Sequence, residues 1–589
     1  MISGQSRPFW RYATILLALL VVLSLDLALI HLTPQSPSQV LFIAATLTAC
    51  LLALSWREPQ QRVLALVIAV GIGALAALLL VRRARIVFPL ADTALLEIYT
   101  KRALTGELLV GPYSRFGWHH PGPVYFYLLA PFYALSDLRS AGLNAGAFTL
   151  GFCAVASMAW IVARSFNAAL SVPIIASIYW YAWRARDLIV SAWNPHAVIL
   201  PTLAVVVSCA AVASHDIAVL PIAVVLASIS VQTNIGAGPA VVALLGLAVG
   251  ATLVQVRNGR AASGHRAIIA VSVGLFVALW LMPVVEQVSH SPGNLTALWR
   301  FFVSGPGAGQ SLSTAAAGWA AMMSGVVDPN FSPSISGTFV AGPMWLHATA
   351  ALQVSLIAGV IGWALQRRNR PLAWLASCCL IASMVGLWSV TRVQGTLMRY
   401  QIIWMSALGA LNFGVVLGAA CEYLSGRLPA WQAPILIRSA VPGIHGVLLA
   451  AYMWLGFYWL VPTLGGRLPA TLSTDLVHRF SAEIQNYLAG HQVRKPLFRL
   501  SQEPWGTAAG ILLDLDRAGV KFAVEESWQS MFLDVFQRTG DEDAELTVGD
   551  PNTHRQLGDR PGNVIVASGR SLYIDAVRID PNPAPPQPK

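Results

Sequence analysis

The sequence predicts a mostly α-helical, polytopic membrane protein with about 13 transmembrane helices and a small C-terminal α/β domain. Two observations lead to this fold class. Of the 589 residues, 56% are hydrophobic and only 11% are charged, whereas soluble domains contain about 25% charged residues. Nearly uncharged stretches of about 20 residues also recur along the first 463 positions, and each can cross a hydrocarbon core of about 30 Å. This composition excludes an ordinary soluble enzyme.

The positive net charge belongs to the membrane part of the chain. Residues 1–463 contain 25 Lys and Arg against 11 Asp and Glu, whereas residues 464–589 contain 13 against 16. Basic residues beside membrane spans contact anionic headgroups and set the orientation of the chain, so nucleic acid is not an expected partner. The six cysteines lie in or beside apolar runs, and their spacing predicts neither a disulfide framework nor a zinc site.

The distribution of Lys and Arg predicts how the chain is oriented. The expected spans lie near residues 11–31, 39–56, 62–81, 141–163, 168–184, 193–213, 217–233, 237–256, 266–287, 345–366, 372–392, 400–421 and 442–463. Because basic loops stay in the cytoplasm, counting from the N-terminus places the loop after residue 81 outside. Counting back from the C-terminus gives the same answer only if the aromatic segment 123–135 does not cross. We therefore expect this segment to lie along the outer interface, with the N-terminus inside and the C-terminus outside.

Four regions follow from this topology. Residues 1–81 form three spans, residues 82–140 a large outer loop, residues 141–463 a ten-span domain with a second outer loop at 288–344, and residues 464–589 an extracytoplasmic domain. Within the last region, hydrophobic periodicity predicts helices and short strands before a proline-rich end. The expected helices cover 474–488 and 510–518, and the expected strands cover 521–524, 563–567 and 572–577.

Acidic residues are scarce in the membrane part, so those on the outer face are informative. The outer-face acids are Asp92, Glu97, Glu107, Asp137, Asp187, Glu286 and Asp328. Asp92 is expected to cap a helix over 92–105 that Gly106 ends. Arg115 and the pair His119-His120 follow it in the same loop. A carboxylate, two histidines and several cations therefore converge where water meets the bilayer.

Each of these residues also has a purely structural interpretation. Asp92 could have no role other than capping its helix. The pair His119-His120 could have no role other than forming the turn before Pro121. Lys101-Arg102 could face lipid headgroups. Three further arginines, Arg82, Arg83 and Arg85, lie on the outer side against the orientation rule and could bind either phosphate or headgroups. Asp26 inside the first span is more consistent with a structural polar contact.

The arrangement resembles the GT-C superfamily of membrane glycosyltransferases, which includes protein O-mannosyltransferases, lipid A aminoarabinose transferases and actinobacterial arabinofuranosyltransferases. Asp92 at the start of helix 92–105 matches the acidic motif on the first juxtamembrane helix, and the run His119 to Pro123 matches the start of the second. Trp193-Asn194-Pro195-His196 matches polar residues at the outer end of a span. The resemblance covers most of residues 62–463. Many members carry two nearby acids, whereas here the next acid is Glu97.

The resemblance implies transfer of a sugar from a polyprenyl-phosphate donor to a cell-envelope glycan, lipid or protein on the extracytoplasmic face. It implies that Asp92 is the base and that one displacement inverts the anomeric carbon. The residues expected to contact substrate are Glu97, Lys101, Arg102, Arg115, His119, His120, Asn194, His196, Glu286 and Arg399. Among them, the cations Lys101, Arg102, Arg115 and Arg399 are expected to bind the donor phosphate. A divalent cation, Mg²⁺ or Mn²⁺, could also neutralise the leaving phosphate, and the sequence leaves this requirement open.

Two other functions fit a polytopic protein with outer cations. One is a polysaccharide polymerase or ligase that uses polyprenyl-diphosphate-linked glycans, and the other is a transporter or flippase for lipid-linked sugars. A ligase has no reason to concentrate acids in its first large outer loop. A transporter predicts paired broken helices and charged residues near mid-membrane, whereas here only Asp26 lies at such a depth.

The predicted topology can be tested with reporter fusions. Fusions at residues 138 and 480 should both report an extracytoplasmic position, because the two charge counts agree only when 123–135 stays at the interface. Paired alkaline phosphatase and fluorescent protein reporters would provide the measurement. A cytoplasmic signal at residue 138 would mean that 123–135 crosses the bilayer.

Overall fold

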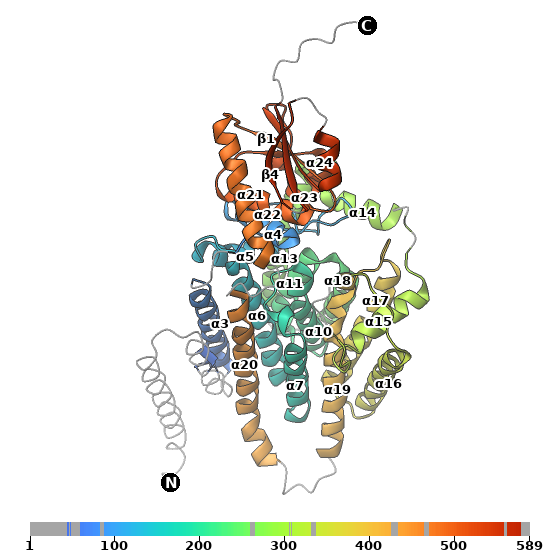
Figure 1. Ribbon diagram of the computed structural model, residues 1–589. Coiled ribbons are helices and arrows are strands. Elements are labelled where there is room, and N and C mark those ends of the chain that lie inside the picture. Colours follow the sequence, from blue (N-terminus) through green and yellow to red (C-terminus); the bar gives the residue numbers. More distant parts are fainter. Residues whose placement is uncertain are drawn as a thin grey trace.

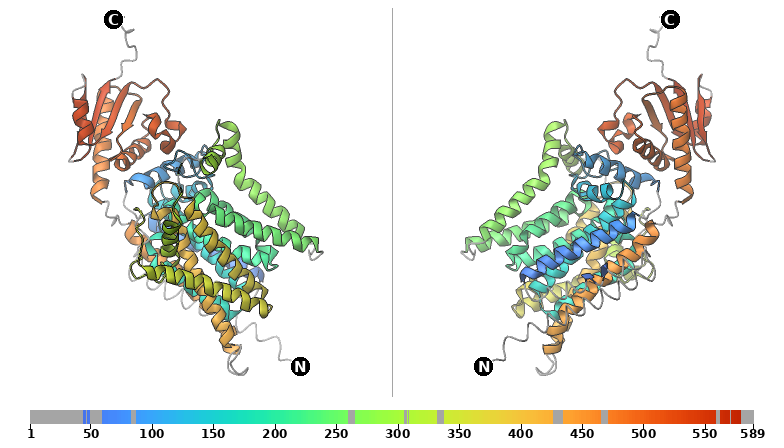
Figure 2. Two further views of the ribbon diagram at one scale, coloured as in Figure 1. Left: turned by 90° about the vertical axis from the view of Figure 1, so that its right-hand side faces the viewer. Right: turned by 90° about the vertical axis from the view of Figure 1, so that its left-hand side faces the viewer.

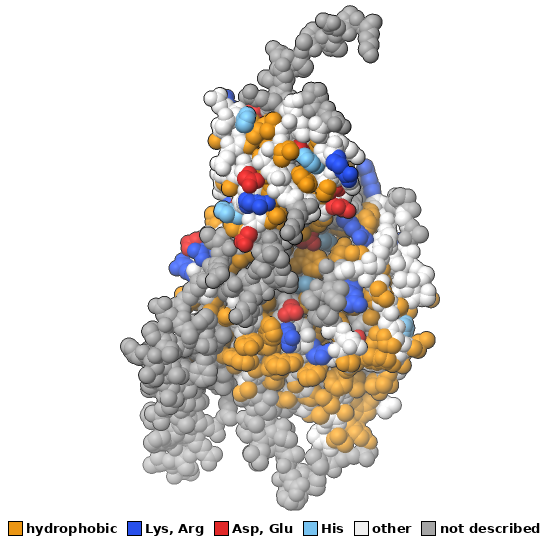
Figure 3. All heavy atoms as spheres, viewed as in Figure 1, with side chains coloured by type: hydrophobic (Ala, Val, Ile, Leu, Met, Phe, Trp, Pro, Cys, Tyr) orange, Lys and Arg blue, Asp and Glu red, His pale blue; other side chains and the backbone are white. Residues whose placement is uncertain are grey.

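The computed structural model describes residues 44–45, 47–48, 59–82, 87–258, 265–304, 307, 309–331, 337–425, 434–464, 471–558, 562–569 and 571–578. A helical bundle carries a separate α/β domain at one end, with short helices between them (Figure 1). The expected span 11–31 and nearly all of 39–56 lie outside the described residues. Hydrophobic side chains cover much of the visible bundle surface, and charged side chains gather on and beside the α/β domain (Figure 3).

Helices occupy all eleven of the remaining expected spans. They are α3 (Pro59–Val81), α6 (Ala141–Ser165), α7 (Ala168–Arg184), α10 (Ile199–Ala213), α11 (Leu220–Thr233), α12 (Gly238–Arg257), α13 (His265–Ser289), α16 (Met344–Gln366), α17 (Arg370–Thr391), α19 (Ser406–Ser425) and α20 (Pro434–Leu464). Within the described part of the chain, seven helical segments are long and apolar enough to cross a membrane. They are Ala141–Ser165, Asn194–Ala213, Ile235–Arg257, His265–Ser289, Met344–Gln366, Arg370–Thr391 and Arg399–Ser425. The protein is therefore a multi-pass membrane protein.

Several short helices extend or precede these spans. They are α8 (Arg186–Ile189), α9 (Asn194–Ala197), η1 (Ile217–Val219), η2 (Ile235–Ala237), α18 (Arg399–Ile402) and η3 (Ile403–Met405). The expected outer loop 288–344 contains two helices, α14 (Asn294–Ser304) and α15 (Leu312–Met323). Helix α14 lies to the lower right of the α/β domain in Figure 1.

Two helices of the first outer loop lie between the bundle and the α/β domain (Figure 1): α4 (Ala91–Leu104) and α5 (Val124–Leu135). Helix α4 ends as expected before Gly106, which has φ +76°. The expected cap at Asp92 was wrong, because the helix begins one residue earlier, Leu90 is the N-cap residue, and no side chain caps it. Helix α5 has 12 residues and a length of about 18 Å, which is too short to cross the hydrocarbon core.

The C-terminal domain is a five-stranded sheet with helices. It contains α21 (Thr471–Gly490), β1 (Pro496–Leu500), α22 (Trp505–Arg517), β2 (Ala523–Val524), α23 (Glu526–Phe532), η4 (Asp534–Phe536), β3 (Ala544–Gly549), α24 (Pro551–Gly558), β4 (Val564–Ser568) and β5 (Tyr573–Arg578). The strand order is β2-β1-β3-β5-β4; β1 is parallel to β2 and β3, and the other pairs are antiparallel. Both expected helices and all three expected strands are present, and the sheet contains two further strands, β1 and β3, that were not predicted.

The first outer loop shares its hydrophobic core with the C-terminal domain. Buried residues of α4 and α5, such as Leu95, Tyr99 and Phe126, belong to the same cluster as Phe480 and Ile511 of the C-terminal domain. A second cluster fills the bundle. Figure 2 shows the C-terminal domain stacked on the same end of the bundle in both side views. Burial of apolar surface therefore fixes α4 against the domain above it.

Candidate active site

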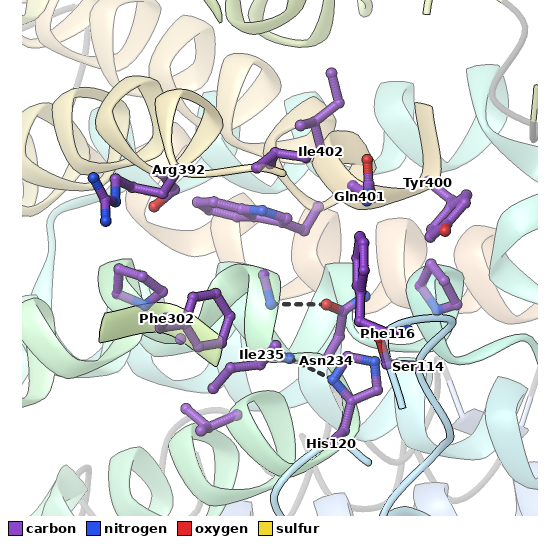
Figure 4. Close-up of a pocket in the computed structure, with 18 of the residues that line it drawn as sticks. Ser114, Phe116, His120, Asn234, Ile235, Phe302, Arg392, Tyr400, Gln401 and Ile402 are labelled. Carbon is purple, nitrogen blue, oxygen red and sulfur yellow. Dashed lines mark hydrogen bonds between the residues drawn. The ribbon is translucent and has the colours of Figure 1, made fainter. Parts of the chain in front are cut away.

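A cavity of about 780 Å³ lies where α4, the loop after it and the ends of several spans meet (Figure 4). The polar and charged side chains that line it are Asp92, Tyr113, Ser114, Arg115, His120, Asn194, Asn234, Ser389, Arg392, Gln394, Tyr400 and Gln401. Of the expected site residues, the structure therefore brings together Asp92, Arg115, His120 and Asn194. Asp92 is the one carboxylate among the described residues that line this cavity.

The walls of the cavity are largely apolar and aromatic. They include Phe116, Trp118, Trp193, Phe301, Phe302, Trp388 and Trp404. Two lining residues on helices long enough to cross the membrane are exposed, Val242 of α12 at 64% and Trp388 of α17 at 55%. Exposed apolar side chains on helices of this kind are suited to contact with lipid tails, and these two residues give the cavity an exposed apolar border. A polar headgroup on an apolar chain suits a space of this kind.

Residues 111–120 form a hairpin that carries several of these side chains. The Ser114 N–H donates to the Trp118 carbonyl at 2.8 Å, and the His120 N–H donates to the Pro112 carbonyl at 2.8 Å. Gly117 has φ +80°, a conformation that glycine adopts without steric cost. A Cβ on Gly111 would lie 2.6 Å from the His120 carbonyl oxygen, so the base of the hairpin closes tightly only with glycine.

Asp92 is held by donors from two other segments. It lies in the first turn of α4 and accepts hydrogen bonds from the Tyr113 hydroxyl and the Trp193 indole. Burial raises the pKa of the Asp92 carboxyl, and the two donors lower it by less, so the net shift is upward. The same burial, together with the neighbouring Asp92, raises the pKa of Tyr113, which keeps its proton and remains a donor. A carboxylate with a raised pKa is a stronger base once ionised.

His120 is a neutral hydrogen-bond donor of fixed tautomer. Its Nδ1 accepts the Ile235 N–H at 3.0 Å (Figure 4), so the ring proton resides on Nε2. Burial lowers the pKa of His120 to about 3, which keeps the ring uncharged at physiological pH. Beside it, the Asn234 Oδ1 accepts the Gly236 N–H at 2.9 Å and shapes the turn into α12. His120 can therefore donate to a sugar or phosphate oxygen.

His119 and Glu286, both expected to contact substrate, do not line the cavity. The His119 Nε2 lies 3.1 Å from the Tyr99 hydroxyl, which donates to the Met531 carbonyl of the C-terminal domain. Burial lowers the pKa of His119 to about 4. Glu286 accepts the Asn294 N–H at 2.8 Å, and the Asn294 side chain makes two hydrogen bonds to the His119 backbone, at 2.8 and 2.9 Å. Glu286 and Asn294 therefore anchor the hairpin.

Two guanidinium groups line the cavity, Arg115 and Arg392. Arg115 donates to the Thr396 carbonyl at 3.0 Å and lies over the Phe116 ring at 4.9 Å. Sequence reasoning missed Arg392, although its place at the outer end of the expected span 372–392 was a usable signal. Arg399 lies near by without lining the cavity, and its backbone N–H donates to the Gly337 carbonyl.

The expected phosphate ligands Lys101 and Arg102 have a different partner. Both pair with Asp516 of α22, at 2.8 and 2.7 Å. Glu97 is fully buried and pairs with Arg517 at 2.6 Å. These three side chains of α4 do not line the cavity and instead join α4 to the C-terminal domain.

Of the two polar residues expected to contact substrate at the start of the span near 193–213, one lines the cavity and the other does not. Asn194 lines the cavity and donates to the Thr233 carbonyl at 3.2 Å. His196 does not line it; its Nδ1 lies 2.9 Å from the Ser191 hydroxyl, and its ring meets that of Trp193 edge-on. Trp193 also contacts the Tyr400 ring, with 5.4 Å between centroids.

The positive charges that the described residues place at the cavity belong to the guanidinium groups of Arg115 and Arg392. No group of three or more His, Cys, Asp or Glu side chains among the described residues lies close enough to hold a metal ion.

Comparison with solved structures gives a structural likeness to a membrane protein. No protein-family model matches the chain, and no curated protein matches it. The chain is similar to ArnT from Cupriavidus metallidurans bound to undecaprenyl phosphate, with 14% identity, a TM-score of 0.47, and coverage of 87% of this chain and 97% of that one. The same ArnT in the apo state gives 15% identity, a TM-score of 0.43 and the same coverage. Because both TM-scores lie below 0.5, the functional proposal rests on the residues of this chain alone.

The Asp92–Tyr113 contact predicts a pH effect. Tyr113→Phe removes a donor that lowers the pKa of Asp92, so that pKa should rise further above its ordinary value. Since a base acts in its ionised form, turnover rises with pH through this pKa, and the acid limb of the kcat/KM profile should move to higher pH. Tyr127→Phe is the control, because Tyr127 donates to the Leu108 carbonyl and does not line the cavity. If the acid limb does not move in Tyr113→Phe, Asp92 is not the group whose titration produces that limb.

Proposed function

We propose that this protein is a membrane glycosyltransferase that moves a sugar from a polyprenyl-phosphate donor to a hydroxyl of a cell-envelope acceptor. The observation that carries the proposal is the cavity itself. It combines one carboxylate, Asp92, with two guanidinium groups, Arg115 and Arg392, inside aromatic walls that have an exposed apolar border. This set of groups supports a reaction at a lipid-linked phosphate.

The proposed topology places this reaction on the extracytoplasmic face. With 13 spans and a cytoplasmic N-terminus, the first outer loop, the loop 288–344 and the C-terminal domain all lie outside. Asp92 and the hairpin belong to the first of these regions, and Phe301 belongs to the second. The donor sugar would then be presented from the outer leaflet.

The donor can be matched to the cavity group by group. Arg115 and Arg392 are proposed to bind the phosphate through charge-assisted hydrogen bonds, for which a guanidinium is well suited. The edge formed by Val242 and Trp388 would admit the polyprenyl chain from the membrane. His120, as a neutral Nε2–H donor, is proposed to hold an oxygen of the sugar.

The reaction is a single displacement. The acceptor hydroxyl oxygen bonds to the anomeric carbon while the bond from that carbon to the phosphate oxygen breaks, and the electron pair leaves with the phosphate. Asp92 takes the proton of the hydroxyl as the new bond forms. Polyprenyl phosphate departs as a phosphate monoester, and the two guanidinium groups stabilise its growing charge. One displacement inverts the configuration at the anomeric carbon.

The central test of this function is Asp92→Asn. The substitution keeps the shape of the side chain but removes the proton acceptor, so turnover should fall by about 10²–10⁴-fold. Asp92 caps no backbone group, and the Oδ1 of an asparagine can still accept from the Tyr113 hydroxyl, so the fold should be retained. Purified protein, a radiolabelled polyprenyl-phosphate sugar and a crude acceptor lipid would measure transfer, and donor binding should be retained.

Asp137→Asn is the matched control. Asp137 is an exposed outer-face carboxylate that does not line the cavity, and its φ of +59° is one that asparagine tolerates. Transfer by this variant should equal that of the unmodified protein. Near-normal transfer by Asp92→Asn would refute the assignment of the base. Donor binding without any transfer by the unmodified protein would favour a transporter.

A further inference from the structure

Helix α22 of the C-terminal domain runs along α4, the helix that carries Asp92. The contact begins at the start of α4, where a Cβ on Gly510 would lie 2.7 Å from the Pro89 carbonyl oxygen and one on Gly506 would lie 3.1 Å from the Ala91 Cβ. It continues to the far end of α4 through Arg517 and Asp516. The two helices therefore meet along the whole length of α4.

The glycine end of this contact lies directly before the proposed base. Gly506 and Gly510 are one turn apart, so they share a face of α22. Ala91, the residue before Asp92, has φ +49°, a left-handed conformation that is costly for alanine. Such a conformation persists only where the surrounding structure holds it. Here Gly506 of α22 lies against Ala91.

The charged residues at the other end of the α4–α22 contact oppose rotation of α4 about its axis and sliding along it. Arg517 pairs with the fully buried Glu97 and donates to the Ser140 hydroxyl at 2.7 Å, which joins α4 to the start of α6. Glu97 also accepts the Tyr133 hydroxyl of α5 at 2.9 Å. Asp516, which is 8% exposed at its side chain, pairs with two successive cations of α4.

Asp92 itself makes its hydrogen bonds to Tyr113 and Trp193, on the cavity side. We propose that α22 is a positioning element, whose Gly506–Gly510 face sets the place of the Asp92 backbone in the cavity. The C-terminal domain would thus act on the chemistry through α4 without touching substrate. This inference rests on the proposed function of Asp92.

The test adds one methyl group at the glycine face. Gly510→Ala places a Cβ against a backbone oxygen, so Pro89 must shift. Because a displacement of about 1 Å in a catalytic group can cost about 100-fold in rate, kcat should fall by about 10- to 100-fold. Gly506→Ala requires a smaller shift at Ala91, and kcat should fall by about 3- to 10-fold. The KM for the polyprenyl-phosphate sugar should not change in either variant, because donor-binding groups are not moved.

A rescue and a control separate positioning from simple stability. Ala91→Gly removes the Cβ that Gly506→Ala would press on and also fits φ +49°, so the double variant should recover kcat. Gly558→Ala, at the end of α24 in the same domain, has open space around its added Cβ and should leave kcat unchanged. All rates are measured on the full-length protein, well below the unfolding temperature of each variant.

The outcomes decide the proposal. If Gly510→Ala does not fold, Gly506→Ala and its rescue still give the answer. Unchanged kcat in Gly506→Ala, or a loss that Ala91→Gly does not restore, would overturn the positioning role. The proposed function fails separately, through normal transfer by Asp92→Asn. Inactive Asp92→Asn together with a fully active Gly506→Ala would reject the positioning role alone.

Discussion

The site depends on keeping one carboxylate, that of Asp92, able to ionise beside apolar walls. Burial penalises the charged form of Asp92, and the hydrogen bonds from Tyr113 and Trp193 offset part of that penalty. Three segments must therefore meet at one point: the start of α4, the hairpin 111–120 and the turn that opens α9. The chain fixes each of them by separate means. The hairpin is held through Asn294, whose side chain binds the His119 backbone, and α4 is held by the C-terminal domain.

The ion pairs between α4 and α22 show how far the structure relies on the C-terminal domain. Glu97 is fully buried, so its pairing with Arg517 matters less for net stability than for specifying one arrangement. Removing either partner would leave a buried charge uncompensated, which commonly costs about 3–5 kcal/mol. Together with the shared hydrophobic core, these pairs make the first outer loop and the C-terminal domain one structural unit. The unit reaches the cavity through the start of α4 and through the hairpin 111–120.

Sequence reasoning identified the features whose signal is local. Long apolar runs gave the spans, Gly106 ended α4 as expected, and Asp92, Arg115, His120 and Asn194 do line one cavity. The partners of Lys101 and Glu97 lie more than 400 residues away along the chain, and only the fold brings Asp516 and Arg517 beside them. No local pattern could have revealed those pairs.

Strands β1 and β3 could not be predicted from the sequence for a related reason. Strands β1 and β3 both lie in the interior of the sheet. Nearly every residue of β1, from Pro496 to Leu500, is buried, and β3 is buried in the same way. A strand covered on both faces lacks the alternation of polar and apolar residues that identifies an exposed strand. The three strands that were predicted include the edge strand β4, where exposed and buried positions both occur.

The most direct measurement of the central claim is a cryo-EM structure of the full chain with bound polyprenyl phosphate. The account predicts phosphate density inside the cavity, within hydrogen-bond distance of Arg115 or Arg392, and a lipid chain leaving past Val242 and Trp388. Asp92 should remain free of the phosphate, on the side open to an acceptor. Phosphate bound outside the cavity, for example at Arg82 beyond the end of α3, would contradict the account.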